Sequence, residues 1–176
     1  RRMGRFMLEA RESHDHLHPG ELARISAARR GVTMAARPLG KGAVIRQREE
    51  NCWLDWQIKP RFGIRYQSRN PRPRFALPFT AEGPVGLTIR VVHPDQRAFG
   101  PLQLLCNGEP VTARPKGLAP GFWGWTALYG AEIRLRADRP SVLEFLLDPL
   151  QVQKGRHFFT KRGFGIGKLW LRPLSR

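Results

Sequence analysis

The chain has 176 residues, of which 41% are hydrophobic and 10% aromatic, so it can bury one sizeable core and is not globally disordered. It carries 31 Lys and Arg residues against 14 Asp and Glu residues, a formal net charge of +17. Such an excess attracts anions, and it indicates an anionic glycan, another polyanion or nucleic acid as the partner. No run of about 18 apolar residues occurs, which excludes a transmembrane helix within this sequence.

Residues 1–43 are predicted to form a basic N-terminal extension that is helical in part. The segment 21–30 contains good helix formers and is followed by Gly31, a typical C-cap residue, so we expect a short helix there. Its apolar stripe is thin, which predicts a helix at the surface. Because the first residue is Arg rather than Met, we expect the chain to be part of a larger chain or assembly.

Three histidines alternate within this extension, at His14, His16 and His18. In an extended segment alternate side chains point to the same side, so three imidazoles could bind one metal ion. A polar segment without a metal is the expected structure, and we predict no cofactor. A metal-dependent enzyme that uses these histidines stays as an alternative.

Residues 44–176 are predicted to form an all-β domain, an antiparallel, jelly-roll-like sandwich of two sheets. Short runs of alternating apolar and polar residues recur about every ten residues, with turn-forming residues and no long helix between them. Asn107–Gly108 predicts a type I′ hairpin turn, because both central residues of that turn need a positive φ. The alternation predicts four core residues in particular: Ile89, Leu104, Ile133 and Phe145. The expected strands are 62–66, 74–79, 86–92, 102–106, 132–137, 142–147 and 168–171.

The two cysteines, Cys52 and Cys106, lie in apolar surroundings and show no metal-binding spacing. This pattern predicts two buried free thiols. Free thiols favour a reducing compartment, so we expect a cytoplasmic protein.

The aromatic residues of the segment 122–129 are the first candidate for a ligand site. Trp123 and Trp125 are two residues apart, so in a strand they share a face, and Tyr129 lies close by along the chain. Their rings could stack on the sugars of a glycan. The alternative is that one Trp belongs to the core and the other packs under a loop. For Trp53 and Trp56, core packing is expected.

A second candidate is the basic stretch 59–74, in which aromatic residues are interleaved with cations. Its arginines Arg65, Arg69, Arg72 and Arg74 could pair with carboxylate or phosphate groups of a ligand. The alternative is an edge strand and loop that the charges keep soluble.

No motif for catalysis is recognisable, and we expect a protein without enzymatic activity. The nucleophile elbow of hydrolases is absent, and no pair of carboxylates stands out as that of a glycosidase. The glycine-rich run 163–167 precedes an expected strand rather than a helix, so it is not predicted to bind phosphate.

Several segments carry a family resemblance: the turn and strand 107–111, the strand 132–135, the apolar strand 143–149 and the closing segment 162–171. Together they resemble a β-sandwich module that is attached to some bacterial glycosyltransferases of surface-polysaccharide assembly. The resemblance covers residues 85–172, about half of the chain, and the family pattern lacks the basic N-terminal half. It implies a carbohydrate-associated sandwich and no catalytic residue, because the family's catalytic residues lie outside this module.

The leading hypothesis is therefore a non-catalytic carbohydrate-associated module that binds or positions an anionic glycan. A nucleic-acid-binding protein, or a structural protein embedded in an assembly, is the second hypothesis, since charge of this size suits sequence-independent binding to phosphates.

Overall fold

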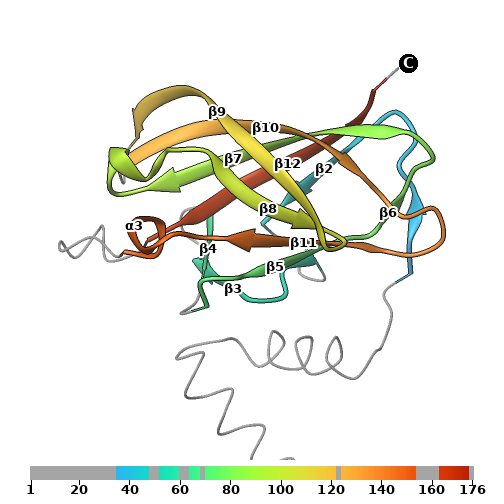
Figure 1. Ribbon diagram of the computed structural model, residues 1–176, viewed down its shortest axis with the longest axis horizontal. Helices are drawn as coiled ribbons and strands as arrows, with labels where there is room; N and C mark the ends of the chain where they lie inside the picture. Colours follow the sequence, from blue (N-terminus) through green and yellow to red (C-terminus); the bar gives the residue numbers. More distant parts are fainter. Residues whose placement is uncertain are drawn as a thin grey trace, which may run out of the picture.

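The structure is a computed structural model that describes residues 35–47, 52–59, 64–67, 70–121, 124–153 and 163–174. The predicted helix 21–30 and the three alternating histidines lie outside these ranges. The elements, in chain order (Figure 1), are β1 (Arg37–Pro38), β2 (Ala43–Arg46), β3 (Trp56–Lys59), β4 (Ile64–Gln67), β5 (Arg74–Leu77), β6 (Phe79–Thr80), β7 (Pro84–His93), η3 (Gln96–Ala98), β8 (Leu102–Cys106), β9 (Glu109–Gly121), β10 (Gly124–Arg134), β11 (Ser141–Leu146), α3 (Pro149–Val152) and β12 (Gly165–Pro173).

Ten strands form one curled antiparallel sheet whose two halves face each other as layers, and β1 and β6 form a separate two-stranded parallel sheet. The order is β3-β4-β12-β7-β10-β9-β8-β11-β5, and β2 also pairs with β12. The long strand β9 belongs to both layers. Its residues 109–113 pair with β8, and its residues 114–121 pair with β10. An isolated bridge between Trp53 and Phe75 joins the segment directly before β3 to β5. In Figure 1, β7, β10 and β12 lie in the upper layer and β5, β8 and β11 in the lower one. The predicted all-β sandwich is confirmed.

The core lies between the two layers and is built by alternation along each strand. Ile89, Leu104, Ile133 and Phe145 are at most 2% exposed, so the predicted core residues are confirmed. Burying the apolar side of each strand against the other layer supplies the main driving force for this fold.

The predicted hairpin turn joins β8 to β9. Asn107 has a φ of 53° and Gly108 a φ of 88°, the left-handed values that a type I′ turn requires. The Asn107 side chain also ties the turn to the next strand, because its Oδ1 accepts from the backbone N–H of Val142 at 3.0 Å and its Nδ2 donates to Oγ of Ser141 at 3.2 Å.

The described fold includes residues on the N-terminal side of the predicted boundary at residue 44. β1 pairs in parallel with β6, and Leu39 is buried in the core. At the other end, β12 begins at Gly165 and is longer than the expected strand 168–171. Gly165 is needed there because a Cβ atom would lie 2.9 Å from the Tyr66 ring. The glycine-rich run therefore begins a strand, as its sequence context predicted.

Both cysteines are free and buried, as predicted. The Sγ of Cys106 donates to the backbone carbonyl of Arg134 at 3.4 Å. Burial raises the pKa of the Cys106 thiol to about 11, so at neutral pH this thiol stays protonated. The compartment of the protein stays a prediction.

Candidate functional site

Tyr129, one of the predicted ligand residues, lies in the core and not on a surface. It points to the same side of β10 as Ala127 and Ile133, and it is 1% exposed. Its hydroxyl donates to the backbone carbonyl of Gly100 at 2.9 Å, and burial raises its pKa to about 12. The prediction that its ring meets a ligand is corrected, because the ring is buried and stacks with that of Phe99 at 6.4 Å between ring centres.

Trp125 lies on this same inward side of β10 and is half-buried against the core. This position corresponds to the alternative of core packing, which the sequence analysis left open. Trp123 lies outside the described residues. Gly124, directly before Trp125, lies close to β7: it has a φ of 133°, and a Cβ atom there would meet the His93 carbonyl oxygen at 2.7 Å.

Arg65 is fully buried and therefore does not reach a surface ligand, which corrects its predicted role. Its Nε donates to the backbone carbonyl of Gln47 at 3.0 Å, and its guanidinium carbon lies 5.5 Å from the centre of the Trp53 ring. A cation over an aromatic face is stabilised by the quadrupole of the ring. Arg65 therefore acts as a packing residue between β4 and the segment before β3.

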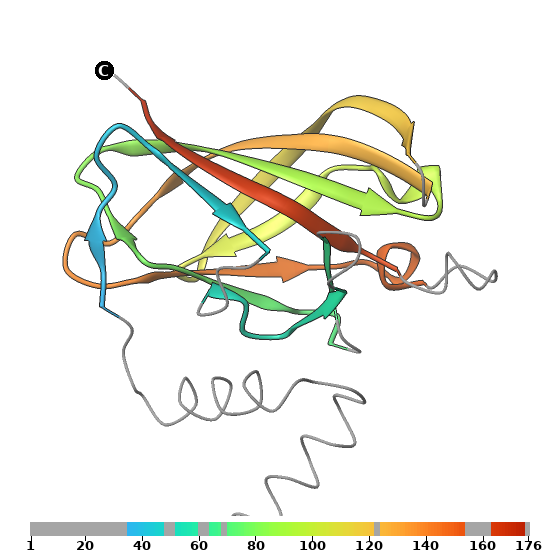
Figure 2. The same cartoon turned by 180° about the vertical axis from the view of Figure 1, so that it is seen from behind.

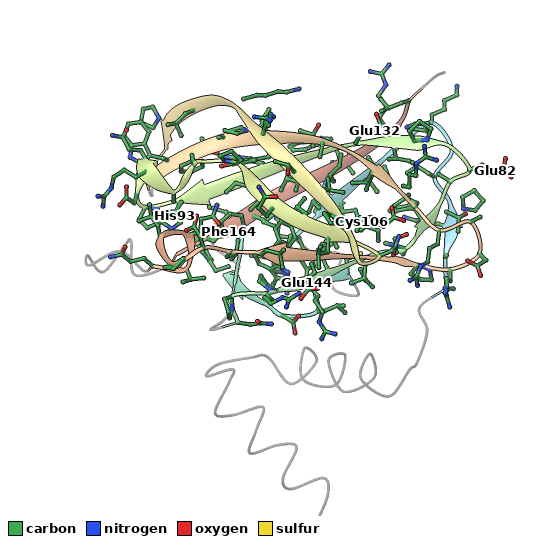
Figure 3. The ribbon with its side chains drawn as sticks, in the orientation of Figure 1. Glu82, His93, Cys106, Glu132, Glu144 and Phe164 are labelled. Carbon is green, nitrogen blue, oxygen red and sulfur yellow. The ribbon has the colours of Figure 1, made fainter. Side chains whose placement is uncertain are left out.

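Arg72 and Arg74 are paired with acids of neighbouring segments. Arg74 donates through its backbone N–H and its Nε to Oδ2 of the buried Asp55, each at 2.9 Å. The Nε of Arg72 lies 2.7 Å from Oε1 of Glu144, which Figure 3 shows on the lower layer. Arg69 lies outside the described residues. The described arginines of this stretch lie on other segments than Trp125: β5 and β10 are separated by three strands in the sheet order, and β4 and β10 by two.

His93 is a buried polar residue that the sequence analysis did not single out. Its Nε2 donates to the backbone carbonyl of Gln151 at 2.9 Å, and its Nδ1 accepts from the backbone N–H of Asp95 at 3.0 Å. Figure 3 shows it beside α3. Desolvation lowers the pKa of His93, and hydrogen bonds to Gln151 and Asp95 oppose this shift only in part. Both ring nitrogens of the neutral form are satisfied, so His93 holds α3 on the end of β7.

Because the pKa of His93 is lower in the folded state than its ordinary value of 6.5, acid should destabilise the fold. The unfolded chain takes up a proton first as the pH falls below about 6.5, and the stability that the neutral ring provides is lost from there downward. We expect the free energy of unfolding to fall more steeply from pH 7 to pH 5 in the wild type than in His93→Gln. Urea unfolding at several pH values measures both slopes, and parallel slopes would contradict this prediction.

A cationic surface that the sequence analysis missed lies on the outward side of the upper layer. We call it the basic face and define it by the outward residues of β2, β12, β7 and β10 and of residues 114–116 of β9. These strands lie next to one another in this order (Figure 2). The register pairs Arg46 with Lys168, Lys168 with Arg90, Arg90 with Leu128, and Leu128 with Lys116. Directly paired residues of antiparallel strands point to the same side, so these residues form one row across five strands.

A second row runs beside the first, two residues along each strand. It consists of Val44, Trp170, Thr88, Gly130 and Arg114 in the same strand order. Trp170 is half-buried at the outer surface, and its cross-strand neighbour Val44 is 42% exposed. The two rows thus combine an apolar patch around an indole ring with five cations.

Two glycines leave room for cationic side chains on this face. A Cβ atom on Gly130 would lie 3.1 Å from Nζ of Lys116, and one on Gly167 would lie 3.3 Å from Cδ of Arg90. The Lys116 side chain therefore extends over Gly130 toward the second row, and the Arg90 stem lies over Gly167.

The cations of the basic face have no acidic partner among the described residues. The ion pairs in the described part of the chain are Arg72–Glu144, Arg74–Asp55 and Arg97–Asp95, and none of them includes a residue of the two rows. Among the described outward positions of these strands, the acidic residue is Glu132. It pairs with Gly86, beyond the second row, and Figure 3 shows it on the upper layer. The face therefore presents uncompensated positive charge.

The described residues also form a pocket that can be compared with this face. A pocket of about 440 Å³ lies where β1 and β6 pair, but its charged lining residue is Glu82, so its charge does not suit an anion. No group of three or more His, Cys, Asp or Glu side chains that could hold a metal ion occurs in the described ranges. No helix within those ranges has the length and apolarity needed to cross a membrane.

No protein-family model matches the chain, and no curated protein matches it. Among solved structures, the chain is similar to the CBM35 from Cellvibrio japonicus Abf62, with a TM-score of 0.45 and 14% sequence identity. The match covers 76% of this chain and 94% of that chain. The fold assignment rests on the strand pairing described above, and the resemblance to a module of bacterial glycosyltransferases stays a prediction.

Proposed function

We propose that this chain is a non-catalytic β-sandwich module that binds an anionic glycan on its basic face. The observation that carries the proposal is the row across five strands next to Trp170, in which four strands contribute cations without an acidic partner among the described residues. The ligand class is the one predicted from the sequence. The proposed site is the outer side of the upper layer instead of Trp123, Trp125 and the stretch 59–74.

The chemistry of the face suits both parts of an anionic sugar. Guanidinium groups such as that of Arg90 pair with carboxylate or sulfate oxygens in a bidentate manner, and the ammonium of Lys168 adds a point charge. The indole of Trp170 offers an apolar surface to the C–H groups on one side of a pyranose ring. The hydroxyl of Thr88, in the same row, can donate to or accept from a sugar hydroxyl.

The acids of the face support binding rather than hydrolysis. A glycosidase generally uses two carboxyl groups on either side of the bond that it cleaves. The described outward positions of the five strands carry one acid, Glu132, at the border of the face. This face therefore lacks the carboxylate pair that hydrolysis would need.

Nucleic acid is the competing ligand class, and the aromatic content of the face favours a glycan. Proteins that bind single strands without sequence preference stack successive bases on several aromatic rings. Among the described residues of the two rows, Trp170 is the one aromatic residue. A glycan with a few stacking contacts fits this arrangement better than a run of bases.

Titration of the protein with polygalacturonate, a linear polyuronate, tests the proposal, with dextran as the neutral glycan. We expect Trp170→Ala and Arg90→Ala each to weaken binding about 5–10-fold, because each removes about 1 kcal/mol of contact with the ligand. Arg139→Ala is the matched control. It removes the same charge from the exposed connection between β10 and β11 and should change affinity less than about 2-fold.

Two outcomes would contradict the proposal. One is equal binding of dextran and polygalacturonate, and the other is polygalacturonate binding that neither Trp170→Ala nor Arg90→Ala weakens. A single-stranded oligonucleotide that binds more tightly than the polyuronate, with a steep loss of affinity in salt, would favour the nucleic-acid hypothesis instead.

A further inference from the structure

We infer that the ligand of the basic face is a linear glycan with a negative charge on successive sugars, and that it runs across the strands from β2 to β9. This inference rests on the proposed function and adds the shape, direction and charge pattern of the ligand. Its basis is the register of five strands, which aligns cations from four of them in one row.

The row is long enough for several sugars. Neighbouring strands lie about 4.8 Å apart, so the four spacings from β2 to β9 give a row of about 19 Å. Cations lie at its β2 end (Arg46), on the next two strands β12 and β7 (Lys168 and Arg90), and at its β9 end (Lys116). A compact anion would meet two of these groups at most, whereas an extended chain can meet all four.

The direction follows from where an acid first lies among the cations. Two residues beyond the second row, the next outward row consists of Arg172, Gly86 and Glu132. In this row an acidic side chain faces the surface as well as a cation. Four of the five positions of the first row are cations, whereas along the strands Glu132 interrupts the positive charge. A polyanion gains most by lying perpendicular to the strands, over the first row.

On β10 the row carries Leu128 instead of a cation, and the neighbouring strand β9 supplies two basic residues. Leu128 is 42% exposed, while Lys116 and Arg114 pair with Leu128 and Gly130. The absence of a side chain at Gly130 lets the Lys116 ammonium extend over β10. The ligand would thus cross the apolar residue Leu128 on β10, with the Lys116 side chain of β9 extending back toward it.

Oligogalacturonides of two, four and six sugars test this inference by calorimetry or fluorescence titration. We expect affinity to rise more than about tenfold from the dimer to the hexamer as the end cations are engaged. Arg46→Ala and Lys116→Ala should weaken the hexamer about 3–5-fold and change the dimer less than 2-fold. Arg90→Ala, at the centre of the row, should weaken both ligands.

Gly130→Ala provides a variant that keeps every charge. Its methyl group displaces the Lys116 side chain, so the hexamer should bind more weakly and the dimer as before. Circular dichroism and thermal unfolding of each variant show whether the fold is retained. Dimer and hexamer of equal affinity, or end variants that weaken the dimer as much as the hexamer, would overturn the extended footprint and leave the proposed function in place. Failure of every oligomer and of the polymer to bind would overturn both.

Discussion

Replacing Phe145 with alanine is expected to lower the free energy of unfolding by about 3–5 kcal/mol, the range for large aromatic residues truncated in a packed core. Phe145 is fully buried on β11, at the junction of the two layers. Its ring meets Trp56 edge-on at 5.3 Å between ring centres and lies 6.1 Å from the ring of Phe164 on the opposite side of the core. Removal of the ring leaves a cavity that these rigid neighbours cannot fill.

Urea unfolding followed by tryptophan fluorescence measures this loss. Leu118→Ala is the control, because Leu118 is 45% exposed on β9 and its truncation should change stability by less than about 0.5 kcal/mol. A loss below about 1 kcal/mol for Phe145→Ala would mean that the two layers do not pack on this ring as the structure shows.

The second large effect is expected for Asp55→Ala, which should cost about 2–4 kcal/mol of folding stability. Asp55 is 2% exposed, and its carboxylate accepts from the backbone N–H and the guanidinium of Arg74. Removing one partner of a buried ion pair leaves the other charge and a backbone N–H without their acceptor. Part of the Arg74 side chain is exposed, so water compensates in part and the expected loss stays below that of a fully buried pair.

Arg72→Ala is the matched control for this second prediction. It breaks the pair with Glu144, in which the Arg72 side chain is 58% exposed, so the expected loss is below about 1 kcal/mol. Equal losses in Asp55→Ala and Arg72→Ala would show that the buried pair does not hold the segment before β3 on β5.

The sandwich could be predicted because its signals are local. In β7 the apolar residues Leu87, Ile89 and Val91 alternate with Thr88 and Arg90, and the structure buries the first set and exposes the second to different degrees. A side chain's direction along a strand follows from the backbone alone, with no knowledge of the partner strands. The turn at residues 107–108 is equally local, since positive φ values select Asn and Gly.

The prediction for Arg65 was wrong because alternation assumes that one side of a strand faces water. In β4, Ile64, Arg65 and Tyr66 are all buried. Trp53, in the segment before β3, covers the side on which Arg65 lies, as the ring contact shows. A strand between two covering segments places charged and apolar residues alike in the interior, and the sequence of the strand does not indicate this.

By itself, the sequence determined the all-β class, several of the strands with residues that they place in the core, and the large positive charge of the molecule. Only the tertiary structure decided where this charge becomes a site. Arg46, Arg90, Lys116 and Lys168 lie far apart along the chain and meet through the register of β2, β7, β9, β10 and β12. Register depends on hydrogen bonds between distant strands and on irregularities such as the shift between Ile166 and Lys168, and a shift of one residue would turn a cation from the surface into the core.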